Sequence, residues 1–462
     1  MPVIYMDRAS AESLTEKDIR DILEENRMDM KYRMLNDYYE GKHPILSKIK
    51  KDRNAPNNRL VTNMAKYITD TATGYFLGQP VIYNATNEEY LQRLQDIFDY
   101  NDEQDHNMEL EKQCSICGSC FEMLYLDEDS QIRFAKIPAG NLIMIYETDS
   151  GHQQPMAAIR QIHSRDKYQN EILKVEFWDA SQVLRFRSVN GGYLNLEAVE
   201  PHYWQDVPFV EYINNEERKG DFEGVITEID AYNKVQSNTA NYFEYNDDAL
   251  LKISKLGDVS TRDIRDIREK GAVILDDGGD VEWLLKQVDD TALENYKNRL
   301  REDIHTMANV PHLCDDSFGG NLSGVAIAYK LWGLEQLCAM KERKFKKGLQ
   351  RRIELITNVL NIFGSRYDYR DVVPKFRRNK PENDVETAQI VTQLAGLLST
   401  ETRMQMLPWV ENVQDELDRL EEEKKKDSDE FGTYENFTKA FAEQGQKTPE
   451  TEAVTDEPAE EE

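Results

Sequence analysis

Three closely spaced cysteines are the first residues in this chain that could ligate a metal. The run C-S-I-C-G-S-C places Cys114, Cys117 and Cys120 three residues apart. A C-x-x-C pair is typical of zinc or redox sites when a second pair or histidines stand at ligand spacing, and the nearest candidate here is His106. The same spacing puts small apolar side chains near one face of a helix end, where cysteines are often simply buried. We therefore expect buried thiols, with no metal and no other cofactor.

A glycine-rich stretch, S-F-G-G-N-L-S-G from Ser317 to Gly324, precedes a helical pattern and could approach phosphate. A phosphate-binding loop of the G-x-x-x-x-G-K-[ST] type needs a lysine and a preceding strand, and both are missing. No set of nucleophile, base and orienting residue stands out elsewhere. The sequence therefore predicts a protein that is not an enzyme. The alternative is a cytoplasmic metal- or nucleotide-binding enzyme that uses the cysteines or this loop.

The glycine-rich stretch lies between a helix that stops at Pro311 and an unusually long apolar pattern. Apolar side chains recur there at spacings of three, four or seven: Leu331, Leu334, Cys338, Phe345, Leu349, Ile353, Ile356, Leu360 and Phe363. If continuous from Val325, this helix has about 39 residues and spans roughly 58 Å, a length typical of extended assemblies.

Basic residues interrupt this long pattern, which excludes a membrane span. They form a stripe that we expect on a solvated or intersubunit face, with DNA contact as the alternative: Lys341, Arg343, Lys344, Lys346, Lys347, Arg351 and Arg352.

Composition limits the class of protein. The 462 residues exceed the usual size of one core, so several subregions are expected. The formal charge of -30 argues against a protein that wraps nucleic acid, but suits a conduit to which DNA does not stick. The first ten residues lack the apolar core of a signal peptide, so we expect a cytoplasmic protein, or an assembly made there, with reduced thiols.

The first half of the chain predicts helices followed by short strands. Thr15 and Asp18 have the spacing of a helix start, and Gly41 ends that helix. The basic, turn-rich segment from Lys42 to Arg59 is predicted to be an exposed loop. The further expected helices cover 60–77, 88–100 and 105–117. The expected strands cover 81–83, 121–126, 132–137, 142–146, 157–163, 172–178 and 183–187, the last six forming an antiparallel sheet packed on helices.

In the second half, two long and thinly apolar helices flank a small insert. A short strand from 207 precedes the first helix, and a capping box at Thr291 and Glu294 starts the second. The insert is expected to hold strands at 249–254, 272–275 and 281–285 and a small helix near Ile264. Neither long helix can bury much within its own chain, so neighbouring copies are the expected partners. A further helical pattern begins at Val385, after a polar and irregular stretch at 367–380.

Three stretches form distinctive sequence motifs: N-N-R-L-V-T-N-M-A-K-Y-I-T-D-T-A-T-G-Y-F-L-G-Q-P-V at 57–81, V-P-F-V-E-Y-I-N-N-E-E-R-K-G-D-F-E at 207–223, and F-G-G-N-L-S-G-V-A-I-A-Y-K-L-W-G-L-E-Q-L at 318–337. Together with the order of the elements, they resemble the portal proteins of tailed bacteriophages, in the branch common in long-tailed phages of Gram-positive hosts. The resemblance covers about residues 15 to 425. It gives the cysteine cluster no role.

The resemblance implies an α+β, mainly helical portal fold: a wing, a two-helix stem, an inserted α/β clip, a tunnel loop, a long helix crossing the wing, and a helical crown. Carried onto this sequence, it implies a wing at 1–220, stem helices at 221–245 and 290–310, a clip at 246–289, a tunnel loop at 311–324, the long helix and wing remainder at 325–373, and a crown at 374–426. The segment 427–462, with 12 Asp/Glu against 2 Lys, is expected to be disordered.

The implied function is a ring of twelve subunits at one capsid vertex, in the virion, assembled in the cytoplasm of the host bacterium. Double-stranded DNA would pass without sequence specificity during packaging and ejection, driven in by a separate terminase. Other implied partners are head completion or adaptor proteins, capsid and scaffolding proteins, and no membrane. The residues expected to face DNA are those of the tunnel loop: Asp315, Asp316, Ser317, Phe318, Gly319, Gly320, Asn321, Leu322 and Ser323.

Overall fold

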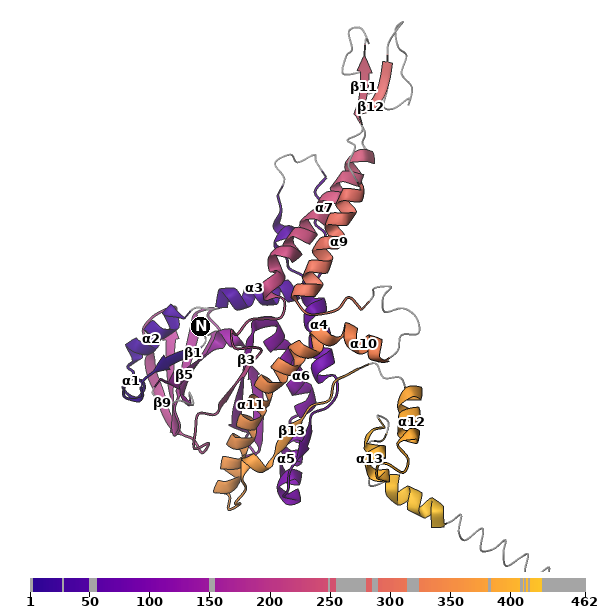
Figure 1. Cartoon of the computed structure of the whole chain (residues 1–462). Coiled ribbons are helices and arrows are strands. Elements are labelled where there is room, and N and C mark those ends of the chain that lie inside the picture. Colours follow the sequence, from indigo (N-terminus) through magenta and orange to yellow (C-terminus); the bar gives the residue numbers. More distant parts are fainter. Residues whose placement is uncertain are drawn as a thin grey trace, which may run out of the picture. The chain divides into compact units, whose positions relative to one another are not determined.

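The computed structural model describes residues 3–26, 29–49, 56–148, 154–247, 250–254, 280–284, 290–313, 324–380, 384–407, 410, 413 and 416–425. The chain forms two compact units, residues 1–380 and 381–462. Helices and strands are both abundant in the first unit, as expected for an α+β fold (Figure 1). None of the helices described here is both long and apolar enough to cross a membrane.

Six strands form the larger sheet. Their order is β1 (Val3–Met6), β5 (Leu142–Glu147), β6 (Pro155–Arg165), β7 (Glu171–Trp178), β8 (Gln182–Val189) and β9 (Asn195–Pro201). Neighbours are antiparallel except β1, which runs parallel to β5. The sequence predicts β5 to β8 but misses both edge strands, because β1 has only four residues and β9 is exposed along almost all its length.

Helices α1 (Arg8–Glu12) and α2 (Glu16–Glu25) cover one side of this sheet (Figure 1). The predicted capping box is confirmed: the Thr15 hydroxyl accepts from the N–H of Asp18, whose carboxylate accepts from the N–H of Thr15. Ile19 of α2 belongs to a small apolar cluster with Val175 of the sheet. The α2 cap therefore begins a helix whose apolar face completes this part of the core.

A second, three-stranded sheet lies at the centre of the main core. It consists of β10 (Phe209–Ile213), β3 (Ser119–Leu126) and β4 (Ile132–Ile137), all antiparallel. Helices α6 (Glu103–Cys117) and α11 (Trp332–Ile362) pack against it. The expectation of one antiparallel sheet is thus wrong, because β3 and β4 form a sheet with β10, which pairs with β3 across about 90 residues of sequence.

The remaining helices of the first unit surround this core. They are α3 (Asp29–Tyr39), η1 (Pro44–Ser47), α4 (Met64–Leu77), α5 (Glu88–Tyr100) and η2 (Ala139–Asn141). The single helix expected from residue 15 to 40 is two helices, because α2 ends at Glu25 with its cap at Asn26. The predicted strand at 81–83 is β2 (Ile82–Asn84), which pairs with β13 (Val373–Lys375). The stretch 367–380, expected to be irregular, therefore contains a strand and the turn η5 (Tyr369–Asp371).

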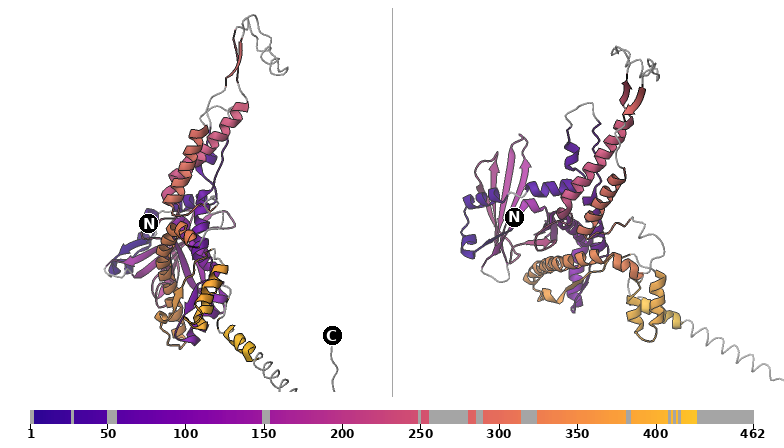
Figure 2. Two further views of the ribbon diagram at one scale, coloured as in Figure 1. Left: turned by 45° about the vertical axis from the view of Figure 1, so that its right-hand side comes forward. Right: turned by 45° about the horizontal axis from the view of Figure 1, so that its top comes forward.

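Two helices, α7 (Ile226–Asp247) and α9 (Asp290–Met307), run side by side away from the sheets (Figures 1 and 2). The turn η3 (Glu223–Val225) precedes α7. Strands β11 (Leu250–Ser254) and β12 (Asp280–Leu284) follow α7 and precede α9 in the chain, and they pair antiparallel. Two predicted strands of the insert are therefore confirmed, and they pair with each other. The predicted strand 272–275 and the helix near Ile264 lie outside the described residues.

An extended segment, residues 58–62, lies along α7, and we call it the strap. Its alternate backbone N–H groups donate to polar side chains one helical turn apart: Thr62 to Asn233 Oδ1 (2.8 Å), Leu60 to Ser237 Oγ (2.9 Å) and Asn58 to Asn241 Oδ1 (2.6 Å). The spacings match, because two extended residues advance about 6.6 Å and four helical residues about 6 Å.

The strap changes the prediction for the segment 42–59. The expected exposed loop is wrong for His43, which is 2% exposed, and for Asn58, which is half-buried and bonded to α7, whereas Arg59 is exposed as expected. The helix expected from residue 60 begins only at Met64, because residues 60–62 belong to the strap. Residues 50–55 lie outside the described part. Asn63, directly after the strap, caps α4 through its side-chain oxygen.

The long predicted helix is present as two segments, α10 (Gly324–Lys330) and α11, which has 31 residues and so extends about 46 Å. They meet at Leu331, whose N–H still bonds to Ile327 O at 3.0 Å. The second unit contains α12 (Asp384–Gln393), α13 (Thr400–Gln405) and a helical stretch at 416–425. It begins at Pro381, because residues 373–375 are part of the first unit.

Candidate functional site

The candidate DNA-facing residues, Asp315 to Ser323, lie outside the described residues. The structure does describe both flanks of this loop: His312 and Leu313 after α9, and Gly324 at the start of α10. The candidate site is therefore built from the groups that hold these flanks and from the contacts of α11.

The end of α9 is fixed by a helix-terminating turn and a buried histidine. Asn309 adopts a left-handed conformation with φ 54°, and the N–H of Val310 returns to His305 O at 3.2 Å. His305 Nδ1 lies 3.0 Å from Val310 O. Burial lowers the pKa of His305, so the imidazole is neutral at pH 7. Because a carbonyl can only accept, the proton of the neutral ring is on Nδ1.

Tyr67 of α4 holds the chain immediately before the candidate loop. Its hydroxyl donates to Pro311 O at 2.9 Å and accepts from the N–H of Leu313 at 2.9 Å. Its ring packs edge-on against His305 with centroids 5.5 Å apart, and His305 in turn lies 5.0 Å from the His312 ring. We call Tyr67 and His305 the base clamp. Its hydrogen bonds and ring contacts join α4, the end of α9 and the first residues of the loop.

Lys341 of α11 lies in a buried cluster of charges near the start of α7. Its Nζ is 2.5 Å from Asp221 Oδ2 and 2.8 Å from Glu111 Oε1, and its side chain is 1% exposed. Asp221 also accepts from the Ser115 hydroxyl at 2.6 Å and from Asn214 Nδ2 at 2.7 Å. Burial raises the pKa of Glu111 to about 7 despite Lys341. The cluster therefore connects α11, α6 and the segment leading into α7.

Arg352, three turns further along α11, is fully buried between two glutamates. It donates through Nε to Glu122 Oε2 (2.9 Å) and through Nη1 to Glu103 Oε1 (3.0 Å) and Asn107 Oδ1 (2.8 Å). Burial of Glu122 acts to raise its pKa, but Arg352 and His106 outweigh it and lower the pKa to about 2. The guanidinium fork thus joins α11 to α6 and to β3.

The predicted solvated or intersubunit face is therefore wrong for Lys341 and Arg352, which are core residues within one chain. Arg351 is also engaged, since its Nη1 lies 2.9 Å from both Asp206 and Glu354. Only Arg343 and Lys347 of the stripe are classed as exposed. Carboxylates of the same chain therefore pair with Lys341, Arg351 and Arg352 of this stripe.

The cysteine prediction is confirmed for burial. Cys114, Cys117 and Cys120 are free and buried, and burial raises the pKa of Cys117 to about 11. His106, the nearest candidate ligand, instead places its Nε2 2.8 Å from Glu122 Oε1. Within the described residues, no group of three or more His, Cys, Asp or Glu side chains is arranged to hold a metal ion.

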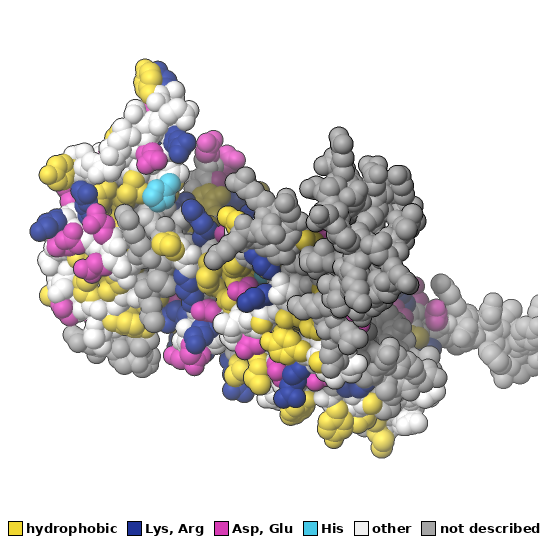
Figure 3. All heavy atoms as spheres, turned by 90° about the horizontal axis from the view of Figure 1, so that it is seen from above, with side chains coloured by type: hydrophobic (Ala, Val, Ile, Leu, Met, Phe, Trp, Pro, Cys, Tyr) yellow, Lys and Arg dark blue, Asp and Glu magenta, His cyan; other side chains and the backbone are white. Residues whose placement is uncertain are grey.

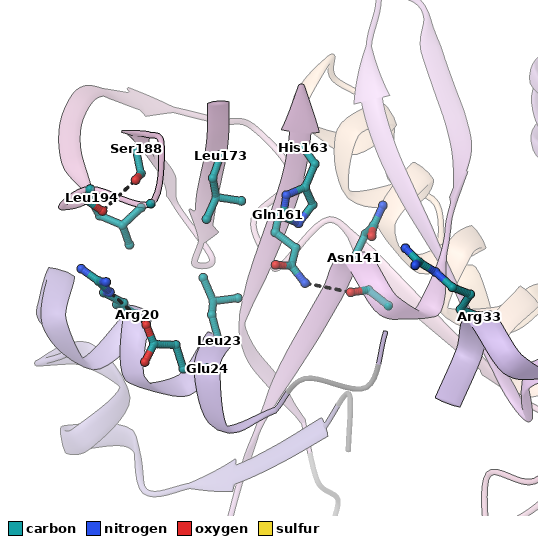
Figure 4. Close-up of a pocket in the computed structure, with 13 residues that line it drawn as sticks. Arg20, Leu23, Glu24, Arg33, Asn141, Gln161, His163, Leu173, Ser188 and Leu194 are labelled. Carbon is teal, nitrogen blue, oxygen red and sulfur yellow. Dashed lines mark hydrogen bonds and ion pairs between the residues drawn. The ribbon is translucent and has the colours of Figure 1, made fainter. Parts of the chain in front are cut away.

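A cavity of about 590 Å³ lies between α2, α3 and the larger sheet (Figure 4). Its polar groups are largely engaged with each other or with backbone: Arg20 pairs with Glu24, Gln161 donates to Gly140 O, and Ser188 donates to Gly192 O. The apolar part is formed by leucines such as Leu173. None of the described hydrogen bonds in this cavity joins a nucleophile to a base.

Seen along the stem, acidic and basic side chains are interspersed over the described surface (Figure 3). Among the described residues, Lys66 pairs with Asp70 and Arg185 pairs with Glu200. The described part of this face therefore does not show one continuous field of negative charge.

Comparison with known proteins gives a consistent result. A sequence model of the family described as "Phage portal protein, SPP1 Gp6-like" matches residues 19–430. The portal protein of Bacillus phage SPP1 is 24% identical over 427 residues, covering 88% of this chain and 83% of the relative. The portal protein of Clostridium phage phiCD119 is 24% identical over 434 residues, covering 87% and 94% respectively. The chain therefore belongs to the SPP1 Gp6-like family of phage portal proteins.

Proposed function

We propose that this chain assembles into a ring, with twelve subunits as the expected number, at one vertex of a phage capsid. Double-stranded DNA passes through the ring into the head during packaging and leaves the same way during ejection. The observation that carries this proposal is the family match over residues 19–430. Membership of this family also argues against the alternative of a metal- or nucleotide-binding enzyme.

The proposed parts follow the elements of the chain. Residues 1–220 form the wing, 221–245 and 290–310 the stem, and 246–289 the clip. The remaining parts are the tunnel loop at 311–324, the long helix with the wing remainder at 325–373, the crown at 374–426 and the acidic tail at 427–462. The pairing of α7 with α9, and of β11 with β12 between them, supports a two-helix stem with an inserted clip.

Several partners belong to the proposal. The terminase and the head completion or adaptor proteins dock on the clip. The clip strands also pair between neighbouring subunits of the ring. The portal initiates capsid assembly in the host cytoplasm, and capsid and scaffolding proteins contact the ring during this assembly. The finished ring stays in the virion at the portal vertex.

In this proposal the tunnel loop faces DNA. Asp315 and Asp316 limit adhesion to phosphate through like charge. Gly319 and Gly320 give the backbone conformations closed to other residues, so that the loop shifts as DNA moves.

Mass measurement combined with electron microscopy tests the assembly. We expect a closed ring near twelve subunits with a central channel. A monomer that binds zinc stoichiometrically or turns over ATP would overturn the proposal.

Replacement of the loop tests the channel role. Changing Phe318 and the residues 319–321 should leave rings intact and should reduce the yield of DNA-filled heads. Normal filling of heads by this variant would refute the assignment of the loop.

A further inference from the structure

The base of the candidate loop is held through a single side-chain oxygen. The Tyr67 hydroxyl uses its one proton on Pro311 O and a lone pair on the N–H of Leu313, both at 2.9 Å. These two backbone groups stand on either side of His312. Because one oxygen binds both, residues 311 and 313 are fixed together in a tight bend at the start of the loop. Phenylalanine, which lacks this oxygen, can make neither bond.

Tyr67 is itself rigidly placed. Its neighbours on α4, Ile68 and Met64, belong to the main core, and Ile68 is fully buried. On the other side the edge of the ring meets His305, whose Nδ1 is occupied by Val310 O. The Tyr67 ring packs against the main core and against this hydrogen-bonded histidine, so its hydroxyl is a fixed point rather than one that follows the loop.

The same helix is also tied to the stem. Five residues before Tyr67, the N–H of Thr62 donates to Asn233 of α7, as the last bond of the strap. The base clamp and the strap therefore connect the loop base to α4, and α4 to α7, through short hydrogen-bonded steps. The loop base is held by α4 and not by α9 alone.

We propose that Tyr67 is a positioning residue for DNA passage: its hydroxyl fixes the point from which the loop extends. This inference rests on the proposed function of the loop. Without the hydroxyl, the bend at 311–313 opens into water, and the loop origin is no longer defined relative to the stem. DNA passage then suffers even though the fold and the ring are unchanged.

The test compares Tyr67→Phe with a matched control, Tyr39→Phe, in complete rings. Tyr39 is also half-buried, and its hydroxyl donates to Asp70 at 2.8 Å and accepts from Lys66 at 3.1 Å, away from the loop base. Both variants keep the aromatic ring and its packing. Hydrogen exchange of the Leu313 amide measures the clamp, and the yield of DNA-filled heads measures passage.

We expect Tyr67→Phe to assemble into normal rings, to exchange the Leu313 amide on the order of 2- to 10-fold faster, and to lose DNA-filled heads. Tyr39→Phe should match the parent protein in both measurements. Unchanged Leu313 exchange in Tyr67→Phe would overturn the clamp.

Faster Leu313 exchange with normal packaging would overturn the positioning role. The loop variant of Phe318 and residues 319–321 separates this outcome from failure of the proposed function. If that variant packages normally, the loop assignment is wrong. If it fails while Tyr67→Phe packages normally, the loop assignment stands and only the role of Tyr67 is wrong.

Discussion

Replacing Lys341 by methionine removes a buried ammonium while keeping an unbranched side chain of similar length. Lys341 is 1% exposed, and its Nζ lies within 2.8 Å of two carboxylates, Asp221 and Glu111. Methionine fills the apolar part of the site, because its flexible thioether adapts to irregular space. The main effect is therefore the loss of charge rather than the loss of packing.

The expected cost follows from what remains in the site. Breaking a buried ion pair by removing one partner costs about 3–5 kcal/mol, since the other charge stays buried. Asp221 keeps its bonds from Ser115 (2.6 Å) and Asn214 (2.7 Å), and Glu111 can take up a proton. We therefore expect a loss of about 3 kcal/mol, near the lower end of that range.

The pH dependence gives a sharper signature. Burial raises the pKa of Glu111 from 4.5 to about 7. As the pH rises, Glu111 loses its proton in the unfolded chain before it does so in the folded chain. The stability that the protonated Glu111 contributes is therefore full below pH 4.5 and is lost as the pH rises to 7. Without the attraction of Lys341, the pKa of Glu111 rises further and the loss continues above pH 7. The difference between variant and parent should be larger at pH 8 than at pH 6, by up to about 1 kcal/mol.

Urea unfolding at fixed protein concentration, at pH 6 and pH 8, measures both effects. Lys347→Met is the matched control, because Lys347 is exposed on the same helix, and it should stay within about 0.5 kcal/mol of the parent. Combining Lys341→Met with Asp221→Asn removes both charges of the Lys341–Asp221 pair and should recover part of the lost stability. A loss below about 1 kcal/mol for Lys341→Met at pH 8, or a smaller loss at pH 8 than at pH 6, would refute this reasoning.

Three further predictions concern other parts of the core. Arg352→Lys cannot reproduce the guanidinium fork, so we expect a loss of about 3 kcal/mol. Because the pKa of Glu122 is lowered to about 2, the stability that its carboxylate contributes is present above pH 4.5 and is lost toward pH 2. Acid unfolding of Arg352→Lys should therefore begin at a higher pH than that of the parent protein. Ser237→Ala leaves the N–H of Leu60 without its acceptor and should cost about 1–3 kcal/mol in urea unfolding; no loss would contradict the strap contacts. The three clustered cysteines should react with a thiol reagent only after unfolding, and zinc bound at one ion per subunit would contradict their assignment as buried thiols.

Apolar periodicity predicted most elements of the first unit, because most strands and helices there carry buried apolar side chains. It failed where pairing is remote or edges are exposed, as for β1 and β9. The strap could not be predicted at all. Its bonds come from Asn and Ser side chains on a different element, and a polar segment rich in turn residues gives no periodic signal.

The burial of the charged core residues could have been predicted from their helical phase, although composition alone does not show it. Lys341 and Arg352 are in phase with Phe345 and Leu349 of the apolar stripe, at offsets of four, eight and eleven residues. Glu103 and Glu111 are likewise eight residues apart on one face of α6. A basic run within a helix suggests a single face, although its members point in several directions. The contact at the loop base could not be predicted from the sequence, because nothing local to Tyr67 indicates that its partner Pro311 lies 244 residues away.

The strap has a mechanical consequence for a protein through which a long polymer is driven. Its three bonds bridge two segments that run side by side and are spaced one helical turn apart along α7, so a pull along that axis loads all three at once. Bonds sheared together resist force better than bonds peeled one after another. A tether of three small polar side chains can therefore keep α7 and α4 in register under axial load, while adding almost no apolar surface to the helix.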